Sequence, residues 1–352
     1  MKKESKELKI GKCTIGGNQA IAVQSMLTCD PLDIHEAIAQ IKELETAGCD
    51  IVRVAVPSME SAQKIAFLKT HTALPLVADI HFNADLAIEA IRQGADKIRL
   101  NPSNIREERK IQEVVTCALD YKIPIRVGAN EGSLKSTERS NKSVVAALFE
   151  AVCREVSLLE KYNFNDIVLS AKASDILINQ EINRKLSSHF DYPIHLGLTE
   201  AGLPCQGIVK TTIGISPLLL EGIGNTLRFS LTGSLVEEVY AARALLRYLG
   251  LEESVEVIAC PTCGRCRWDV SSAAKRVMDA VSRIKLKASV AVMGCEVNGP
   301  GEASHADFAL AGSGKQVLLF KHGQRMASGK EEEMLKLLLE LLHHWQAEDP
   351  AR

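Results

Sequence analysis

The chain has 352 residues, of which 46% are hydrophobic and 24% are charged, as in ordinary soluble globular proteins. Its 42 Lys and Arg residues nearly balance its 44 Asp and Glu residues, and a net charge of −2 gives no global attraction to nucleic acid or to an anionic membrane. Aromatic residues make up only 4%, too few for the stacking surface of a protein that binds single-stranded nucleic acid.

The N-terminal segment MKKESKELKIGKCTIGG mixes lysines with glutamates and has no apolar run like that of a signal peptide. No apolar run anywhere reaches the ~20 residues of a membrane span. We therefore expect a cytoplasmic protein with no membrane partner. In that reducing compartment, clustered cysteines are more often metal ligands than disulfides.

Eight short runs rich in β-branched residues, each followed by a segment of helical periodicity, fill the first 250 residues. The runs lie at 20–27, 50–56, 75–81, 96–101, 123–130, 165–172, 192–199 and 225–232. The clearest helical segments are 33–48 and 234–250. This pattern predicts an α/β fold with a (β/α)8 TIM-type barrel. A doubly wound open sheet is the alternative, but eight even repeats favour a closed barrel.

After the predicted barrel, the regular alternation of strand and helix patterns ends. We expect strands at 255–259 and 288–294, a helix at 271–284, a hairpin of 306–312 with 316–320, and a final helix at 330–345. Three glutamates stand in the first turn of that helix, where the helix dipole favours acids. The sequence thus predicts a small α+β domain after the barrel. The expected domains are 1–252 and 253–352.

Polar side chains stand at the predicted carboxyl ends of the barrel strands, where barrel enzymes place their catalytic groups. They are Arg53, His81, Arg99, Asn101, Arg126, Asn130, Lys172, His195 and Arg228. Cationic or imidazole groups occupy seven of the eight strand ends, and such charges repel one another unless an anion neutralises them. A guanidinium group can bind two phosphate oxygens at once, so the pattern favours a phosphorylated substrate. Several such groups would suit a diphosphate. The alternative is that these cations pair with carboxylates of the loops.

Four cysteines gather in the last quarter of the chain. Cys260 and Cys263 form a C-x2-C pair, a spacing shared by zinc and iron–sulfur sites, and Cys295 follows a predicted strand. Four thiolates, with Cys266 as the fourth, would form a closed structural site. Three thiolates leave one position open, which Glu302 could fill as a harder and more labile ligand. Spacing alone leaves zinc and iron–sulfur equally open.

Several motifs carry a resemblance to a known family. They are VQSM (23–26), HLGLTEAG (195–202), GIGNTLRFSLT (222–232), CPTCGR (260–265) and GCEVNGPGEA (294–303). The chain resembles the (E)-4-hydroxy-3-methylbut-2-enyl diphosphate synthases of the methylerythritol phosphate pathway of isoprenoid biosynthesis, in their compact bacterial two-domain form. The likeness runs in order from residue 10 to the last helix.

The resemblance implies an iron–sulfur oxidoreductase. Such enzymes open the ring of 2-C-methyl-D-erythritol 2,4-cyclodiphosphate and remove a hydroxyl by a two-electron reduction. A [4Fe–4S] cluster passes on single electrons from flavodoxin or ferredoxin. Family members are homodimers in which the cluster domain of one subunit closes on the barrel of the other.

The resemblance also implies roles for single residues. Cys260, Cys263 and Cys295 match the thiolate ligands, and Glu302 matches the carboxylate on the fourth iron, where the catalytic step takes place. The residues that match the substrate-binding set are Arg53, His81, Arg99, Asn101, Arg126, Asn130, Lys172, His195 and Arg228. Residues 1–252 then form the substrate-binding domain and residues 253–352 the cluster domain.

The chain departs from the family pattern at a few positions. Ser103 and Arg106 stand where glycines are usual, Asn225 replaces a common aspartate, and Glu131 stands where a small residue is frequent. Cys266 is not a family ligand, and we expect it to be a bystander.

Two other functions compete with this interpretation. One is a hydro-lyase that uses an open iron site only as a Lewis acid. The other is a C-terminal zinc ribbon for protein or nucleic-acid contacts that follows a separate barrel enzyme. The chain lacks the basic stripe of a nucleic-acid binder, which argues against nucleic acid as the partner.

Overall fold

The chain divides into two compact units in a computed structural model. The structure describes residues 4–80, 83–105, 107–134, 143–282, 284, 286–295, 305–314 and 316–348. The first unit, the barrel unit, comprises Met1–Glu45 and Cys49–Leu251. The second, the C-terminal unit, comprises Thr46–Gly48 and Glu252–Arg352.

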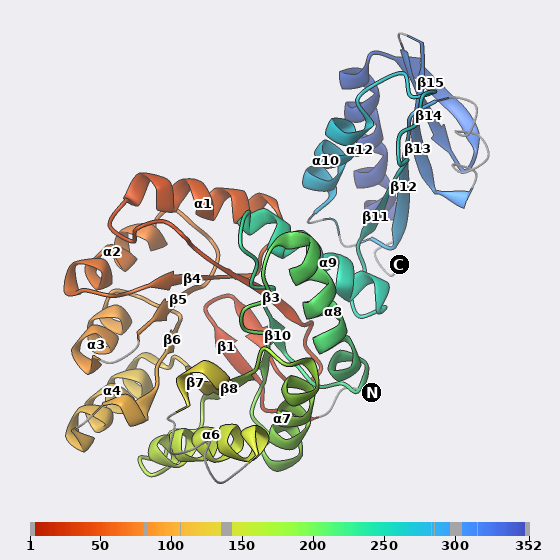
Figure 1. Ribbon diagram of the computed structural model, residues 1–352. Coiled ribbons are helices and arrows are strands. Elements are labelled where there is room, and N and C mark those ends of the chain that lie inside the picture. Colours follow the sequence, from red (N-terminus) through yellow and green to blue (C-terminus); the bar gives the residue numbers. More distant parts are fainter. Residues whose placement is uncertain are drawn as a thin grey trace. The chain divides into compact units, whose positions relative to one another are not determined.

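Eight parallel strands form the sheet of the barrel unit (Figure 1). They are β3 (Ala22–Met26), β4 (Ile51–Ala55), β5 (Leu76–Asp79), β6 (Lys97–Arg99), β7 (Ile125–Asn130), β8 (Ile167–Lys172), β9 (His195–Leu196) and β10 (Thr226–Leu227). Their order is β8-β7-β6-β5-β4-β3-β10-β9, and a parallel bridge between Leu169 and Ile194 joins the two ends. The predicted TIM-type barrel is confirmed.

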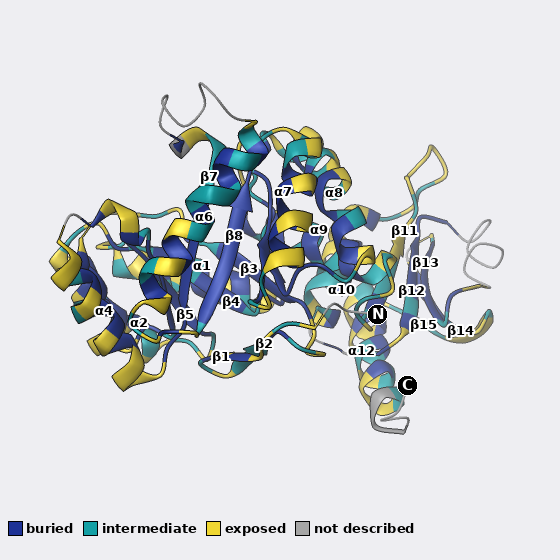
Figure 2. Cartoon of the chain, turned by 90° about the horizontal axis from the view of Figure 1, so that it is seen from below, coloured by how far each residue is buried: buried dark blue, intermediate teal, exposed yellow. Residues whose placement is uncertain are grey.

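Helices follow the strands and surround the sheet (Figure 1). They are α1 (Ile34–Thr46), α2 (Met59–Lys69), α3 (Ala84–Arg92), α4 (Glu108–Tyr121), α6 (Val144–Glu160), α7 (Ile176–His189), α8 (Pro204–Leu220) and α9 (Leu235–Tyr248). Their inner faces are buried and their outer faces are exposed (Figure 2). Side-chain caps define several starts: Asn83 accepts a hydrogen bond from the Asp85 amide, and Asp175 accepts one from the Ile178 amide.

A short antiparallel hairpin, β1 (Leu8–Ile10) with β2 (Cys13–Ile15), lies across one end of the barrel (Figure 2). Its apolar residues form one core cluster with Ala22, Ile51, Val77 and Val168 from the barrel strands. The hairpin therefore closes the amino-terminal end of the barrel, since these residues begin their strands or lie near the start. The sequence analysis missed it because three-residue strands are too short to display an alternating pattern.

The C-terminal unit contains one five-stranded sheet in the order β11-β12-β13-β14-β15. Its strands are β11 (Val255–Ala259), β12 (Ala288–Met293), β13 (Phe308–Ser313), β14 (Gln316–Lys321) and β15 (Gln324–Gly329). The first three are parallel, and β13, β14 and β15 pair antiparallel. Helices α10 (Val270–Val281) and α12 (Glu331–Glu348) pack on the sheet through a shared apolar core.

The structure confirms the predicted helices and the predicted hairpin of this unit, in which β13 pairs with β14. Strand β15 was not predicted, because its six residues are exposed or half-buried and give no apolar alternation. Within the described residues, no helix is both long and apolar enough to cross a bilayer.

Candidate active site

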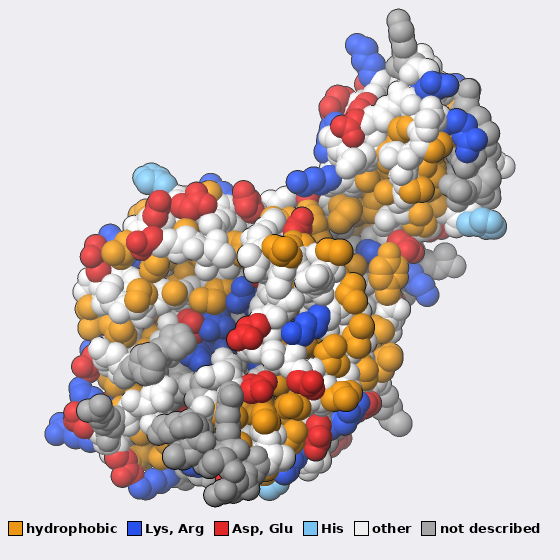
Figure 3. Space-filling model, in the orientation of Figure 1, with side chains coloured by type: hydrophobic (Ala, Val, Ile, Leu, Met, Phe, Trp, Pro, Cys, Tyr) orange, Lys and Arg blue, Asp and Glu red, His pale blue; other side chains and the backbone are white. Residues whose placement is uncertain are grey.

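A cavity of about 250 Å³ opens at the carboxyl ends of the barrel strands. It is lined by Arg53, Arg99, Arg126, Gly128, Asn130, Ser170, Lys172, Leu198, Thr199, Glu200, Arg228 and Ser230. Lysine and arginine side chains gather in a hollow near the centre of the barrel unit (Figure 3). Six of the nine substrate-binding residues predicted from the sequence therefore share one cavity.

Asp79, at the end of β5, pairs with two of these cations. Its Oδ2 lies 2.6 Å from Arg53 Nη2, and its Oδ1 lies 3.6 Å from Arg99 Nη1. Burial raises the pKa of Asp79, but the charges of Arg53, Arg99 and Arg126 outweigh it and hold the pKa below its ordinary value. Asp79 is thus ionised and fixes the two guanidinium groups.

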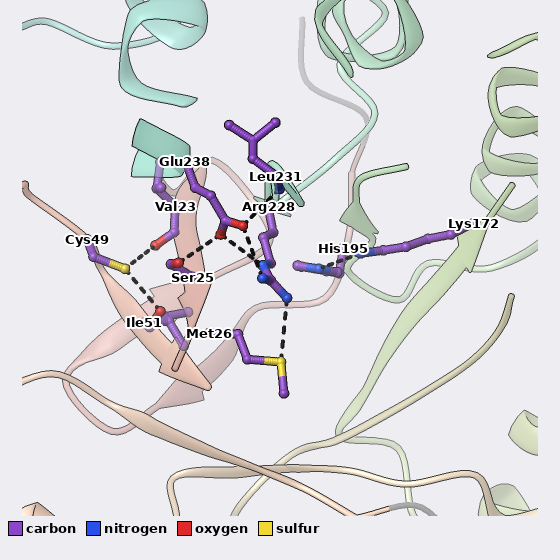
Figure 4. Close-up of polar contacts among 10 residues, drawn as sticks. All are labelled: Val23, Ser25, Met26, Cys49, Ile51, Lys172, His195, Arg228, Leu231 and Glu238. Atoms are coloured by element: carbon purple, nitrogen blue, oxygen red, sulfur yellow. Dashed lines mark hydrogen bonds and ion pairs between the residues drawn. The ribbon is translucent and has the colours of Figure 1, made fainter. Parts of the chain in front are cut away.

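Glu238, on α9, holds a third cation. Arg228 donates to it twice, from Nε at 3.0 Å and from Nη2 at 3.1 Å (Figure 4). The same carboxylate accepts hydrogen bonds from Ser25 Oγ at 2.8 Å and from the Leu231 amide at 3.0 Å. Four hydrogen bonds compensate the burial of this carboxylate, which is 2% exposed. The geometry locks Arg228 in one orientation beside the cavity.

Arg126 and Lys172 differ from these three cations. Neither forms an ion pair with a carboxylate in the described part of the chain, and Arg126 Nη1 is buried there without a hydrogen-bond partner. Burial, followed by the charges of Arg53 and Arg99, lowers the pKa of Arg126 well below its ordinary value. Burial, followed by the charges of Arg126 and Arg228, does the same to the pKa of Lys172. Carboxylates of the described residues thus pair with only part of the cationic set that lines the cavity.

The other predicted residues take different positions. His195 is fully buried outside the cavity lining, with Nε2 3.4 Å from Lys172 Nζ and Nδ1 2.7 Å from Thr226 Oγ1. Asn101 is also absent from the lining; it precedes a 3-10 turn (Pro102–Asn104), and its buried Oδ1 has no hydrogen-bond partner among the described residues. His81 lies outside the described residues.

The cysteines lie in the C-terminal unit, at the carboxyl ends of two neighbouring parallel strands. Cys260 directly follows β11, Cys295 lies just beyond β12, and the Cys260 amide donates to the Val292 carbonyl at 3.0 Å. Thr262 adopts φ of 51°, a left-handed conformation that turns the backbone between Cys260 and the exposed Cys263. None of the ten cysteines forms a disulfide.

Cys266 has its own local partners. Its Sγ donates to the Trp268 carbonyl at 3.0 Å, and a Cβ on Gly294 would approach that Sγ to 2.9 Å. The Trp268 indole donates to the Met293 carbonyl at 2.8 Å, and the Arg267 amide donates to the Gly294 carbonyl at 2.9 Å. These contacts tie the 260–268 loop to the end of β12 and use the Cys266 thiol in packing.

Glu302, the fourth ligand expected from the sequence, lies outside the described residues. Within the described part, no three His, Cys, Asp or Glu side chains already lie close enough to hold a metal ion.

Family models match both units. The model of the GcpE TIM-barrel domain matches residues 5–243, and that of the GcpE protein C-terminal domain matches residues 256–344. The chain belongs to the GcpE family.

Its similarity to GcpE proteins extends over nearly the full length. A relative from Caldanaerobacter subterraneus subsp. tengcongensis is 49% identical over 342 residues, which are 96% of this chain and 96% of the relative. One from Thermodesulfovibrio yellowstonii is 46% identical over 342 residues, which are 96% of this chain and 98% of the relative. Both are named 4-hydroxy-3-methylbut-2-en-1-yl diphosphate synthase (flavodoxin).

Solved structures agree on the barrel. Type I 3-dehydroquinate dehydratase from Clostridium difficile matches with a TM-score of 0.51 and 14% identity, over 70% of this chain and 97% of that chain. At this identity the likeness shows the fold alone.

The sequence analysis of this GcpE chain missed two carboxylates at the site. Glu238 could have been noticed, because it interrupts the apolar face of the predicted helix 234–250, between the buried Leu235 and Val239. Glu200 lines the cavity with a left-handed backbone, at φ of 54°. Nothing in the sequence around Glu200 signals that conformation.

Three of the departures from the GcpE pattern have structural partners. Asn225 Oδ1 accepts from the Ile194 amide at 3.0 Å, while its Nδ2 donates to Ser5 Oγ at 3.1 Å, a donation that an aspartate could not make. Ser103 donates to the buried Glu155, and Glu131 accepts from the Ser174 amide at 3.3 Å. Arg106 lies outside the described residues.

Proposed function

We propose that this chain catalyses the reductive ring opening of 2-C-methyl-D-erythritol 2,4-cyclodiphosphate to 4-hydroxy-3-methylbut-2-enyl diphosphate, the product that the names of its relatives carry. Two electrons enter, a carbon–oxygen bond to phosphate opens, and one hydroxyl takes a proton and leaves as water. The observation that supports this most is the barrel cavity, which Arg126 and Lys172 line without carboxylate partners in the described part of the chain.

The proposed substrate site lies within residues 1–252. The guanidinium groups of Arg53, Arg99, Arg126 and Arg228 and the Lys172 amine would bind the two phosphates through charge-assisted hydrogen bonds. Asp79 and Glu238 keep three of these cations in place before the substrate arrives, so less ordering is needed on binding. Asn130 in the lining, with Asn101 and His81, would orient the carbon chain.

The proposed redox site lies within residues 253–352. Cys260, Cys263 and Cys295 would hold a [4Fe–4S] cluster together with Glu302. The donor set fits: Cys260 and Cys295 follow neighbouring parallel strands, Cys263 is exposed, and none of these thiols is in a disulfide. When bound, the cluster would supply single electrons, and Glu302, its one ligand that is not a thiolate, would be the catalytic residue.

The electron donor in this proposal is flavodoxin, which the names of the relatives carry, with ferredoxin as the alternative. A cytoplasmic location would suit a chain with ten cysteines outside disulfides.

The experiment that tests the function is an anaerobic purification followed by metal analysis and turnover. We expect about four irons and about four acid-labile sulfides per chain, and product only when a reductant is present. One zinc without sulfide would instead support a structural zinc site. A cluster that converts the substrate without any reductant would support a hydro-lyase.

We also propose a homodimer in which the cluster domain of one subunit serves the barrel of its partner. Mixing an Arg126→Leu variant with a Cys263→Ser variant should then restore activity, because one site of each mixed dimer combines two intact domains. Random exchange predicts recovery to about a quarter of the wild-type rate. No recovery, despite subunit exchange proven by mass spectrometry, would place the whole site within one chain.

A further inference from the structure

A buried hydrogen-bonded chain runs from the cavity into the wall of the barrel. Lys172, at the end of β8, lines the cavity, and its Nζ lies 3.4 Å from His195 Nε2 on β9 (Figure 4). His195 Nδ1 lies 2.7 Å from Thr226 Oγ1 on β10. His195 and Thr226 are register partners on adjacent parallel strands, and both are fully buried. His195 therefore reaches the cavity only through Lys172.

The chemistry of the three groups sets the direction of these hydrogen bonds. Once Lys172 is protonated, its ammonium group can only donate, so Nε2 of His195 must then accept from it. In that state the hydrogen of the neutral ring stands on Nδ1, where the Thr226 hydroxyl can accept it. Burial, followed by the charges of Lys172 and Arg126, lowers the pKa of His195 well below its ordinary value and keeps the ring neutral. Thr226 can therefore stabilise the tautomer that presents an acceptor to Lys172.

The surroundings of Lys172 oppose its protonation while the cavity holds no anion. The charged and titratable groups that act on Lys172 and His195 are Arg53, Lys97, Arg126, Arg228 and Glu238. Only Glu238 is acidic, and it already accepts two hydrogen bonds from Arg228. Glu200 adds one carboxylate to the cavity lining. A dianion in the cavity would reverse this balance and favour the ammonium form.

We propose that His195 and Thr226 are positioning residues that prepare the Lys172 amine to take up a proton as the anionic substrate binds. This inference rests on the proposed function and adds to it that substrate binding and proton uptake are coupled. His195 acts through Lys172 and does not contact the substrate.

Isothermal titration calorimetry with the cyclic diphosphate tests the coupling. The cluster-containing enzyme is titrated without reductant between about pH 6 and pH 9, in buffers of different ionisation enthalpy, so that binding occurs without turnover. Each phosphate of the cyclic diphosphate has a single strongly acidic hydroxyl, so the ligand stays dianionic throughout and any proton enters the protein. We expect uptake of up to one proton, with affinity falling as the pH rises through the window between the pKa of Lys172 in the free and the bound enzyme.

Variants of Thr226 separate positioning from mere packing. Thr226→Val keeps the shape of the side chain but removes the hydroxyl. The His195 ring can then carry its hydrogen on Nε2, so that Lys172 faces a hydrogen-bond donor instead of an acceptor. We expect the uptake window to move to lower pH and the affinity at pH 8 to fall about tenfold, the equivalent of one pKa unit. Thr226→Ser, which keeps the hydroxyl, should behave like the wild type. Lys172→Met should abolish proton uptake.

Circular dichroism and thermal unfolding establish that each variant is folded, and Thr226→Ala, which also lacks the hydroxyl, replaces Thr226→Val if the latter is not. An unchanged pH profile in Thr226→Val would overturn the positioning role of Thr226 and His195. Continued proton uptake in Lys172→Met would overturn the role of Lys172 and point to Lys97 or His195 as the titrating group. If the wild-type enzyme did not bind the cyclic diphosphate at all, the proposed function itself would fail, and the coupling with it.

Discussion

Replacing Cys263 with serine should remove the iron–sulfur cluster and lower the activity to below about a thousandth of the wild-type rate. Cys263 is exposed on the turn between β11 and α10, so its thiol is available for ligation. Serine is a poor ligand for a metal that prefers soft thiolate. The measurements are iron and sulfide content, the visible charge-transfer spectrum, and the rate with excess reductant.

Cys266→Ser is the matched control, three residues further along the same loop. Its thiol already donates to the Trp268 carbonyl at 3.0 Å, a bond that a serine hydroxyl can also make. We expect this variant to keep both the cluster and the activity. The assignment of three thiolates and Glu302 would be wrong if Cys266→Ser lost the cluster while Glu302→Gln kept cluster and activity.

Arg126→Leu should raise the KM for the cyclic diphosphate strongly while leaving the cluster spectrum intact. The lost charge-assisted hydrogen bonds correspond to about 2–3 kcal/mol, or roughly a 30- to 150-fold increase in KM. Because Arg126 is 5% exposed and has no carboxylate ion pair among the described residues, leucine removes an uncompensated buried charge. The free energy of unfolding should therefore stay the same or increase.

Steady-state kinetics and denaturant unfolding check both parts of this prediction. Arg184→Leu provides the control: Arg184 pairs with Glu221 at 2.7 Å on the exposed surface, and its loss should change neither KM nor the spectrum. An unchanged KM in Arg126→Leu would remove Arg126 from the phosphate site. A loss of stability would mean that the Arg126 side chain has a structural partner in the folded chain.

Local patterns in the sequence determined most of the architecture. Eight β-branched runs alternating with helical periodicity predicted the barrel, because each strand and each helix carries its own period. Strand ends could be located from these runs, and the topology of a parallel barrel brings all carboxyl ends to one side. This is why six predicted residues, Arg126 among them, line a single cavity. The C-x2-C pair likewise needed only spacing within one turn.

Elements without a periodic pattern of apolar residues could not be predicted from the sequence. The hairpin β1–β2 and strand β15 are too short or too exposed to display apolar alternation. Their strand conformation comes from pairing with a neighbouring strand, and for the hairpin from packing against the barrel interior as well.

The polar pairing at the site was decided by tertiary structure alone. Arg228 pairs with Glu238 from the following helix, and Arg53 pairs with Asp79 from the next strand. His195 lies within hydrogen-bond distance of Lys172, which is on the preceding strand. The sequence does not identify the partner of a charged side chain, because the ionisation and orientation of that side chain depend on which groups the fold places within a few ångströms. The sequence by itself therefore determined that cations gather at one end of the barrel. Only the folded chain decided which of these cations pair with carboxylates of the described residues and which do not.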